Sequence, residues 1–287
     1  MPELPEVETV RRGLQKYIVG KKIIKVQVET GFAKKIIPSV RMLKKALIGD
    51  SVSQVWRRAK LLVLFLGGGK SVLVHLKMTG QFIFVSQKGS LFGGGHPIER
   101  QTLPNKFTRV QIEFASGEKL YFNDIRKFGF LKLVNNESLE NEIAKYGPEP
   151  LTREFNLLYF KHVLKSRPKR KIKQLLLEQN LIAGLGNIYA DEALFQARIN
   201  PERLAGGIKG VEADLLFKKI QSIIIKAIKY KGTTISDYVH ATGNKGAYQK
   251  FLKVYGRSGE SCYLCGAKIT KIKLGGRSSS FCPVCQK

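Results

Sequence analysis

The chain has 287 residues, 43% of them hydrophobic, which is enough for about two domain cores and excludes a wholly disordered protein. Its 50 Lys and Arg against 22 Asp and Glu give a formal net charge of +28 at pH 7, and a charge this one-sided favours a polyanionic partner. Because no apolar run approaches the ~18 residues of a membrane span and the N-terminus is acidic, unlike a secretory signal, we expect a soluble, cytoplasmic chain without membrane contact.

The N-terminal half is predicted to be one helix followed by β-strands. Apolar residues from Leu4 to Ile18 recur every three to four positions, with Pro5 near the start and Gly20 beyond the end, which predicts a helix of about four turns. Several of the β-type runs that follow alternate apolar with polar residues, which favours an antiparallel sandwich or barrel over βαβ units. These runs cover residues 22–28, 51–56, 61–66, 71–76, 81–85, 108–114, 119–122 and 130–134. Residues 86–107, rich in glycine, are expected to form a long loop.

The pattern changes near residues 147–150, Gly-Pro-Glu-Pro, and beyond them the apolar period is helical. The predicted helices cover residues 155–164, 172–179, 188–197 and 211–230. We therefore expect a multidomain α+β protein, with a β-rich domain over residues 1–135, a linker over 136–150, a helical domain over 151–257 and a terminal cysteine module over 258–287.

The four cysteines are arranged as two Cys-x2-Cys pairs, sixteen residues apart: Cys262, Cys265, Cys282 and Cys285. This spacing is typical of a tetrahedral four-cysteine zinc site. Two disulfides are the alternative, but an intracellular compartment keeps thiols reduced. A module this small cannot build a sufficient core, so the metal should supply its folding energy. We expect one structural zinc ion and no organic cofactor.

Basic residues gather in two places. Residues 161–173 hold seven Lys and Arg and no acid, and residues 245–287 hold nine against a single acid, Glu260. Clustered positive charge favours nucleic acid over a merely solubilising surface or an anionic membrane. Between these clusters, residues 183–188 lack the third glycine of a dinucleotide fingerprint and follow no strand. They predict a turn that opens a helix, with Asn187 as its N-cap and a helix start that could hold a phosphate.

The first residues could carry nucleophilic chemistry. A small second residue such as Pro2 is commonly exposed by removal of the initiator Met1. A free α-amine has a pKa of about 7.7–8.0, so roughly a third is unprotonated near pH 7.5, which makes it a ready nucleophile. Because the amine of proline is secondary, its carbonyl adduct is a cationic iminium, and Glu3 could act as general acid. The alternative is an ordinary helix entry with glutamates at the positive end of the helix dipole.

A set of short elements lies in order along the chain: residues 1–8 (MPELPEVE), 57–60 (RRAK), 75–80 (HLKMTG), 123–129 (NDIRKFG), 184–189 (GLGNIY), 232–234 (GTT) and the cysteine tail up to residue 286. Their order and spacing resemble the formamidopyrimidine-DNA glycosylases, which excise oxidised purines. The resemblance implies an N-terminal helix with an antiparallel β-sandwich, a helix–two-turn–helix domain over residues 151–257 and a β-hairpin zinc finger over 258–287. It also implies a monomer that binds duplex DNA containing oxidised bases or abasic sites, in a nucleoid-associated location.

The resemblance further implies a bifunctional glycosylase and AP lyase of base excision repair. Pro2, freed of Met1, would attack C1′ of the damaged nucleotide while Glu3 protonates the sugar. The Schiff base would then decay by β- and δ-elimination and cut the strand on both sides of the lesion. Lys60, counted with the catalytic residues, and Lys173 match phosphate-binding and lesion-proximal lysines.

The resemblance assigns the remaining roles to DNA contacts. Asn187 and Arg277 match phosphate clamps, and His75 and Arg126 are further DNA-binding positions. Met78, Arg126 and Phe128 match the residues that fill the gap when the lesion flips out, whereas composition alone would place Met78 and Phe128 in a core.

Two positions depart from the family pattern. Ile125 replaces the usual proline before the gap-filling arginine, and Lys127 replaces the arginine after it, so we expect a less rigid loop. Residues 233–248 match a segment that covers flipped 8-oxoguanine, which favours the purine-specific branch, as does Leu4. The alternatives are an endonuclease VIII-like glycosylase for oxidised pyrimidines, a non-catalytic DNA damage-binding protein and, for the tail alone, a zinc-ribbon RNA-binding protein.

Overall fold

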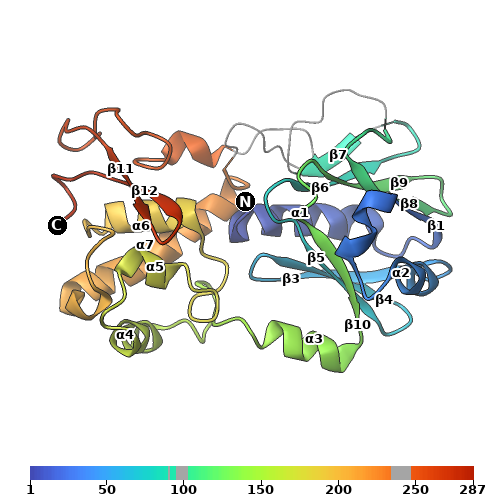
Figure 1. The fold of residues 1–287 in the computed structure, drawn as a ribbon, viewed down its shortest axis with the longest axis horizontal. Coiled ribbons are helices and arrows are strands. Elements are labelled where there is room, and N and C mark those ends of the chain that lie inside the picture. The colour runs from blue at the N-terminus through green and yellow to red at the C-terminus, as the bar shows by residue number, and fades with distance from the viewer. Residues whose placement is uncertain (90, 95–102, 234–246) are drawn as a thin grey trace. The chain divides into compact units, whose positions relative to one another are not determined.

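The computed structural model of the chain describes residues 1–89, 91–94, 103–233 and 247–287 (Figure 1). It divides into two compact units: the first comprises Met1–Ala144 and Tyr230–Ala247, and the second comprises Lys145–Lys229 and Tyr248–Lys287. The helix α3 (Asn136–Ile143), inside the segment expected to be a linker, packs on strand β10 and belongs to the first unit. The cysteine hairpin belongs to the second unit together with the helices.

The main part of the first unit is formed by the N-terminal helix α1 (Leu4–Ile18) and two five-stranded sheets (Figure 1). One sheet has the order β1-β8-β9-β6-β7 and the other β2-β10-β5-β4-β3. Every pairing is antiparallel except that of β10 with the two-residue β2. The strands are β1 (Ile23–Val28), β2 (Ile36–Ile37), β3 (Val52–Arg58), β4 (Leu61–Leu66), β5 (Ser71–His75), β6 (Gly80–Val85), β7 (Leu91–Gly94), β8 (Thr108–Phe114), β9 (Lys119–Asp124) and β10 (Phe130–Val134).

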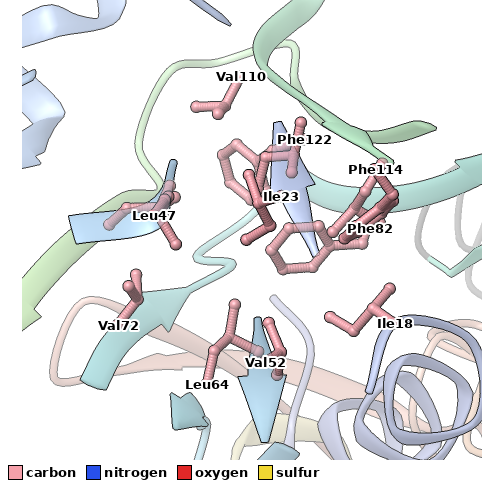
Figure 2. A pocket seen from close by; sticks show the side chains of 13 residues that line it. Ile18, Ile23, Leu47, Val52, Leu64, Val72, Phe82, Val110, Phe114 and Phe122 are labelled. Atoms are coloured by element: carbon pink, nitrogen blue, oxygen red, sulfur yellow. The ribbon is translucent and has the colours of Figure 1, made fainter. Parts of the chain in front are cut away.

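One apolar core joins the two sheets and α1. The helix buries Val7, Val10, Leu14 and Ile18 on one face, at the three-to-four-residue spacing that the sequence shows. Figure 2 shows side chains from both sheets and from the end of α1 converging on the centre of this core. The cavity that they leave is about 10 Å³ and apolar, room for about one water, so the interior of the sandwich is packed and is not a ligand site.

The first unit also contains elements that the sequence does not predict. Helix α2 (Val40–Leu47) begins at Ser39, whose hydroxyl accepts the Met42 N–H at 3.2 Å, and buries only Leu43 and Leu47. Helix α3 begins at Asn135, whose side chain accepts the Ser138 N–H at 2.9 Å. Strand β7 lies inside the stretch expected to be a loop, where it pairs with β6. A 3-10 helix, η1 (Thr30–Lys35), joins β1 to β2.

The second unit packs short helices around a central helix, α6 (Asn187–Gln196), that is almost entirely buried. Helix α6 contacts α7 (Gly210–Lys229), α5 (Ile172–Leu176) and strand β12 (Arg277–Phe281), which pairs antiparallel with β11 (Thr270–Leu274). Helix α4 (Leu157–Ser166) packs on α7 through Phe160 and Phe217. The remaining elements are η2 (Ala205–Gly207) and η3 (Tyr248–Phe251). The prediction of a β-sandwich unit, a helical unit and a cysteine hairpin is confirmed.

Helix α6 carries two adjacent buried acids that bind different segments. The carboxylate of Glu192, 0% exposed, accepts the backbone N–H groups of Lys253, Val254 and Tyr255, each at 2.9 Å. Asp191, 1% exposed, accepts the hydroxyl of Ser279 and the N–H of Ser280 from β12. Burial raises the pKa of both carboxyls, and these hydrogen bonds oppose that rise.

In the part of the chain that the structure describes, no helix has the length and apolar character needed to cross a bilayer.

Candidate functional site

The start of α1 buries the residues proposed for nucleophilic chemistry. Pro2 and Glu3 are both buried, and Glu3 is the N-cap of the helix. The Glu3 N–H donates to the Glu6 carboxylate at 2.8 Å, which forms one half of a capping box. The backbone therefore forms an ordinary helix entry, as the alternative interpretation expects. This entry places Pro2 and Glu3 at the positive end of the helix dipole.

Two cations lie near the N-terminal amine. Burial lowers the pKa of the Met1 amine below its ordinary value of 8.0, and the charges of Lys60 and Arg126 lower it further, while those of Glu3 and Glu6 oppose the change. Lys60 is 4% exposed and follows Ala59, whose φ of 53° makes the tight turn between β3 and β4. The structure thus brings Lys60 and Arg126 into the electrostatic environment of the residue that precedes Pro2.

Glu6 also holds a second segment against the start of α1. Its other carboxylate oxygen accepts the Thr233 N–H at 2.8 Å. Gly232, with φ of +79°, lies so close that an added Cβ would be 2.5 Å from this oxygen, so glycine is required both by its conformation and by space. The start of the segment expected to cover the lesion is therefore fixed to the N-terminal helix. Residues 234–246 of that segment lie outside the described residues.

The three gap-filling candidates are exposed on two neighbouring loops of the first unit. Met78 is 42% exposed and Phe128 is 46% exposed, so neither belongs to the core in which composition alone would place it. The Arg126 guanidinium lies 4.6 Å from the centre of the Phe128 ring, which forms a cation–π pair. Exposed apolar side chains next to a planar cation fit a wedge that enters a base stack.

His75, at the end of β5, is held in its neutral form. Its Nδ1 accepts the Lys77 N–H at 2.9 Å, so the proton of the neutral ring is on Nε2. Burial, followed by the charges of Lys77 and Lys60, lowers the pKa of His75 to about 3. His75 can therefore offer one N–H donor at any physiological pH, as a phosphate contact requires, but not a positive charge.

In the second unit, Lys173 is buried and paired. Its side chain is 1% exposed, and its ammonium donates to the Asp191 carboxylate and, at 3.2 Å, to the Asn187 carbonyl. A direct contact between this ammonium and a DNA phosphate would require the buried ion pair to open. Lys173 is therefore an interior residue of the second unit, where it connects α5 to the start of α6.

Asn187 is the first residue of α6, and Gly186 is the N-cap, so the prediction that Asn187 caps the helix is wrong by one position. The Asn187 side chain instead donates to the Ser278 carbonyl of β12 at 2.9 Å, one residue from the exposed Arg277. The turn before Arg277 uses Gly275 and Gly276, with φ of 54° and 78°. Asn187 and Arg277, which the sequence separates, are thus brought together.

The four cysteines form a compact set that fits zinc. Their Sγ atoms all lie within 4.8 Å of one another, with 3.5 Å between Cys265 and Cys282 and 3.9 Å between Cys262 and Cys285. Four thiolates at about 2.3 Å from one tetrahedral Zn²⁺ would be about 3.8 Å apart, which agrees with these distances. The N–H groups of Leu264 and Cys285 point at Sγ atoms at 3.4 Å, as is usual for metal-bound thiolates. One structural zinc ion fits this site.

Sequence reasoning missed the residues that hold the site together. Glu6, Thr79 and Asp124 lie within the quoted motifs but received no role, because their partners are far away in the sequence. Asp191 lies in none of the motifs. Nothing in the local sequence distinguishes these acids and this threonine from the polar residues around them.

Comparisons with known proteins agree with this arrangement. Three family profiles match in order: the formamidopyrimidine-DNA glycosylase N-terminal domain over residues 1–131, its H2TH domain over 146–239 and the zinc finger found in FPG and IleRS over 259–287. Among curated relatives, a formamidopyrimidine-DNA glycosylase of Pelotomaculum thermopropionicum is 43% identical over 100% of this chain and 99% of its own. One of Heliobacterium modesticaldum is 40% identical over 100% of both.

Solved structures agree as well. Lactococcus lactis Fpg in complex with DNA containing an abasic site is 38% identical, with a TM-score of 0.87 over 99% of each chain. A mutant of the same protein with DNA containing Fapy-dG has a TM-score of 0.89 over 100% of each chain, again at 38% identity. With three profiles in order and relatives matched end to end, the chain belongs to the formamidopyrimidine-DNA glycosylase family.

Proposed function

We propose that this protein is a DNA glycosylase and AP lyase of base excision repair that removes oxidised purines, chiefly 8-oxoguanine and formamidopyrimidines, from duplex DNA. Family membership supports the reaction, and the net charge of +28 supports the polyanionic substrate. The observation that carries the proposal is the start of α1, where Pro2 and Glu3 are buried and the charges of Lys60 and Arg126 act on the N-terminal amine.

Pro2 is the proposed nucleophile once Met1 has been removed. Its nitrogen attacks C1′, the glycosidic bond to the base breaks, and Glu3 protonates the sugar. The resulting iminium withdraws electrons from the sugar, so β-elimination and then δ-elimination expel the two phosphates. Burial, together with the charges of Lys60 and Arg126, lowers the pKa of the Met1 amine at this end of the helix, and the same surroundings are proposed to favour the unprotonated, nucleophilic form of the Pro2 amine once Met1 has been removed.

The DNA contacts are proposed from exposure and chemistry. Arg277 offers an exposed guanidinium, Asn187 lies beside it, and His75 offers a neutral N–H donor. Lys173 is proposed to affect binding indirectly, through the Asn187 carbonyl and Asp191. The four cysteines would hold zinc, which supplies folding energy to the β11–β12 hairpin and so presents Arg277.

A second candidate substrate class has one specific observation behind it. A solved complex of Lactococcus lactis Fpg, 38% identical to this chain, contains DNA with an oxidised pyrimidine. Oxidised pyrimidines are therefore proposed as secondary substrates of the same site. We further propose that the protein acts as a monomer in the cytoplasm, in association with the nucleoid.

Borohydride trapping tests the proposal. Incubation with duplex DNA containing 8-oxoguanine and borohydride should give a covalent protein–DNA adduct, and peptide mapping should place it at Pro2. A Pro2→Gly variant should lose most of the trapping, whereas a damage-binding protein without catalysis would bind the DNA equally well with either residue. An adduct at a lysine, or no adduct at all, would contradict the proposal.

A further inference from the structure

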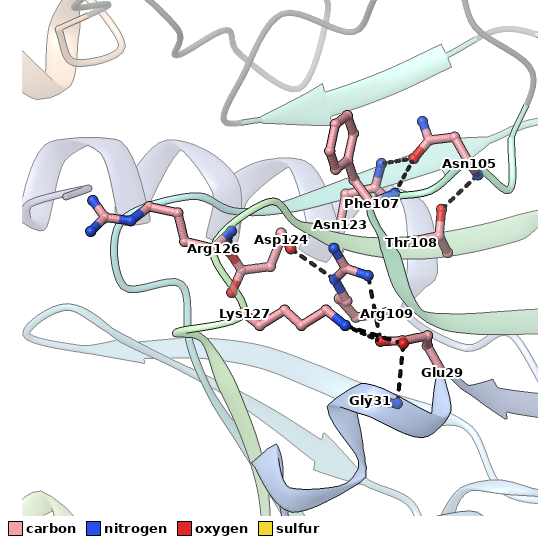
Figure 3. A network of polar contacts seen from close by, with 10 residues as sticks. All are labelled: Glu29, Gly31, Asn105, Phe107, Thr108, Arg109, Asn123, Asp124, Arg126 and Lys127. Atoms are coloured by element: carbon pink, nitrogen blue, oxygen red, sulfur yellow. Dashed lines mark hydrogen bonds and ion pairs between the residues drawn. The ribbon is translucent and has the colours of Figure 1, made fainter.

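The two loops that carry the gap-filling residues meet at one buried carboxylate. We call residues 76–80 the Met78 turn and residues 124–129 the Arg126 loop. Asp124, the last residue of β9, begins the Arg126 loop and is 0% exposed. Figure 3 shows it at the base of this loop, beside Arg109 and Arg126.

Both oxygens of Asp124 are engaged with these loops. Oδ1 accepts the hydroxyl of Thr79, which belongs to the Met78 turn, and the N–H of Arg126 at 3.2 Å. Oδ2 accepts the N–H of Gly129 at 2.7 Å, at the other end of the Arg126 loop. The Thr79 hydroxyl also accepts the Arg126 N–H at 3.0 Å. One carboxylate thus closes the Arg126 loop on itself and joins it to the turn that carries Met78.

The backbone on both sides of this junction is constrained. Lys77 and Lys127, which precede Met78 and Phe128, have φ of 51° and 54°, in the left-handed region that non-glycine residues rarely adopt. An added Cβ at Gly129 would lie 2.9 Å from the Phe122 ring and 3.1 Å from Asp124 Oδ2. Such conformations persist only where surrounding contacts hold them. Here Asp124 binds the N–H groups of Arg126 and Gly129 on both sides of Lys127, and His75 accepts the N–H of Lys77 while Asp124 binds Thr79 in the same turn.

A second set of charged residues contacts the main chain of Asp124 and of the Arg126 loop. The Arg109 guanidinium donates to the Asp124 carbonyl at 2.8 Å and lies 3.4 Å from the Glu29 carboxylate (Figure 3). Glu29 also pairs with Lys127 at 3.2 Å. These contacts fix the main chain of the Arg126 loop without using the guanidinium of Arg126 or the ring of Phe128, which remain exposed.

We propose that Asp124 is a positioning residue that sets the Met78 turn and the Arg126 loop as one rigid wedge, so that Met78, Arg126 and Phe128 enter the base stack together. This inference rests on the proposed function. Opening a lesion-containing base pair costs a few kcal/mol, and a wedge with a fixed shape offsets that cost without first having to be ordered.

The test compares two substrates that differ in the need for a wedge. Excision of 8-oxoguanine paired with cytosine requires a base pair to be opened, whereas cleavage at a preformed abasic site does not. Single-turnover rates on both are measured for Asp124→Asn and Thr79→Val, with Thr79→Ser as the matched control that keeps the hydroxyl. The thermal unfolding midpoint of each variant is recorded. A third measurement follows 2-aminopurine beside 8-oxoguanine paired with cytosine, where fluorescence rises when the wedge enters the stack.

Asp124→Asn and Thr79→Val should each lower the rate of excision by about tenfold, the loss expected for one charge-assisted hydrogen bond. Their abasic-site cleavage should stay within about twofold of the parent protein, and Thr79→Ser should behave as the parent on both substrates. The 2-aminopurine signal should fall in the first two variants. Equal losses on the two substrates, or no loss on either, would overturn the proposal. If the parent protein fails to excise 8-oxoguanine, the proposed function is wrong. The 2-aminopurine signal would then still decide the role of Asp124.

Discussion

The neutral state of His75 predicts how the stability of the first unit depends on pH. The pKa of His75 is about 3 in the folded chain and about 6.5 in an unfolded one. As the pH falls below 6.5, the unfolded chain binds a proton that the folded chain does not. The stabilisation from a neutral His75 is therefore complete above about pH 6.5 and is lost progressively as the pH falls toward 3.

The size of this effect at pH 5 depends little on the folded pKa. At pH 5 the unfolded imidazole is about 1.5 pH units below its pKa, and each unit corresponds to about 1.36 kcal/mol, so unfolding becomes about 2 kcal/mol easier than at pH 8. The chain has a single tryptophan, Trp56, which lies in β3 of the first unit. Its fluorescence during urea unfolding therefore reports the unit that contains His75.

The measurement is a double difference. The free energy of unfolding is determined at pH 8 and pH 5 for the parent protein and for His75→Gln, which cannot titrate. Lost packing against Phe130 and the titration of all other groups cancel, because they affect both proteins or both pH values alike. The parent should lose about 2 kcal/mol more than the variant between pH 8 and pH 5. Equal losses in the two proteins would refute the assignment of a neutral, half-buried His75.

Three further predictions follow from the second unit and from the start of α1. Removal of zinc by a chelator, or Cys265→Ser, should unfold the β11–β12 hairpin and weaken DNA binding, with thiol titration and DNA affinity as the measurements. Arg277→Ala should make the slope of log binding constant against log salt concentration shallower by about one unit. Lys173→Met should leave that slope nearly unchanged but lower the free energy of unfolding by about 3 to 5 kcal/mol, because Asp191 would stay buried without its cationic partner. The reverse pattern would contradict the buried placement of Lys173. Gly232→Ala should lower lesion excision at least tenfold without loss of abasic-site DNA binding, because its Cβ would displace the Glu6 carboxylate, and wild-type excision rates would show that this contact is dispensable.

The parts of the fold that could be predicted from the sequence are those set by local pattern. Strands β4, β8 and β10 and helix α1 have the predicted bounds, because alternation or helical spacing of apolar residues is continuous over their length. Helices α2 and α3 are too short for a clear period and bury few apolar residues, so only their N-caps, Ser39 and Asn135, marked them. Strand β7 has a glycine-rich sequence, and its pairing with β6 outweighs that composition.

The residues of the candidate site could be proposed from the sequence, but the contacts that hold them in place could not. The resemblance assigned roles to Pro2, Glu3 and Lys60, and local order sufficed for the cysteine pairs. The burial of Lys173 was not predictable, because a lysine in a basic stretch gives no sign of a carboxylate on another helix. The same holds for Asp124, which is far from Thr79 in the sequence and becomes its partner only when the strands pair. Hydrogen bonds between distant segments produce no periodic pattern in the sequence from which they could be predicted.

The adjacent acids of α6 have a consequence for protein engineering. Asp191 accepts hydrogen bonds from β12, which lies inside the cysteine-bearing tail. Glu192 accepts hydrogen bonds from three backbone amides that precede this tail. A tail of residues 258–287 transplanted onto another scaffold would lose its contacts with Asp191, and a chain truncated before residue 258 would leave Asp191 without the two donors from β12. The tail therefore depends on hydrogen bonds from α6 and cannot be exchanged between proteins by itself. Chimaeras between relatives should exchange it together with α6, or not at all.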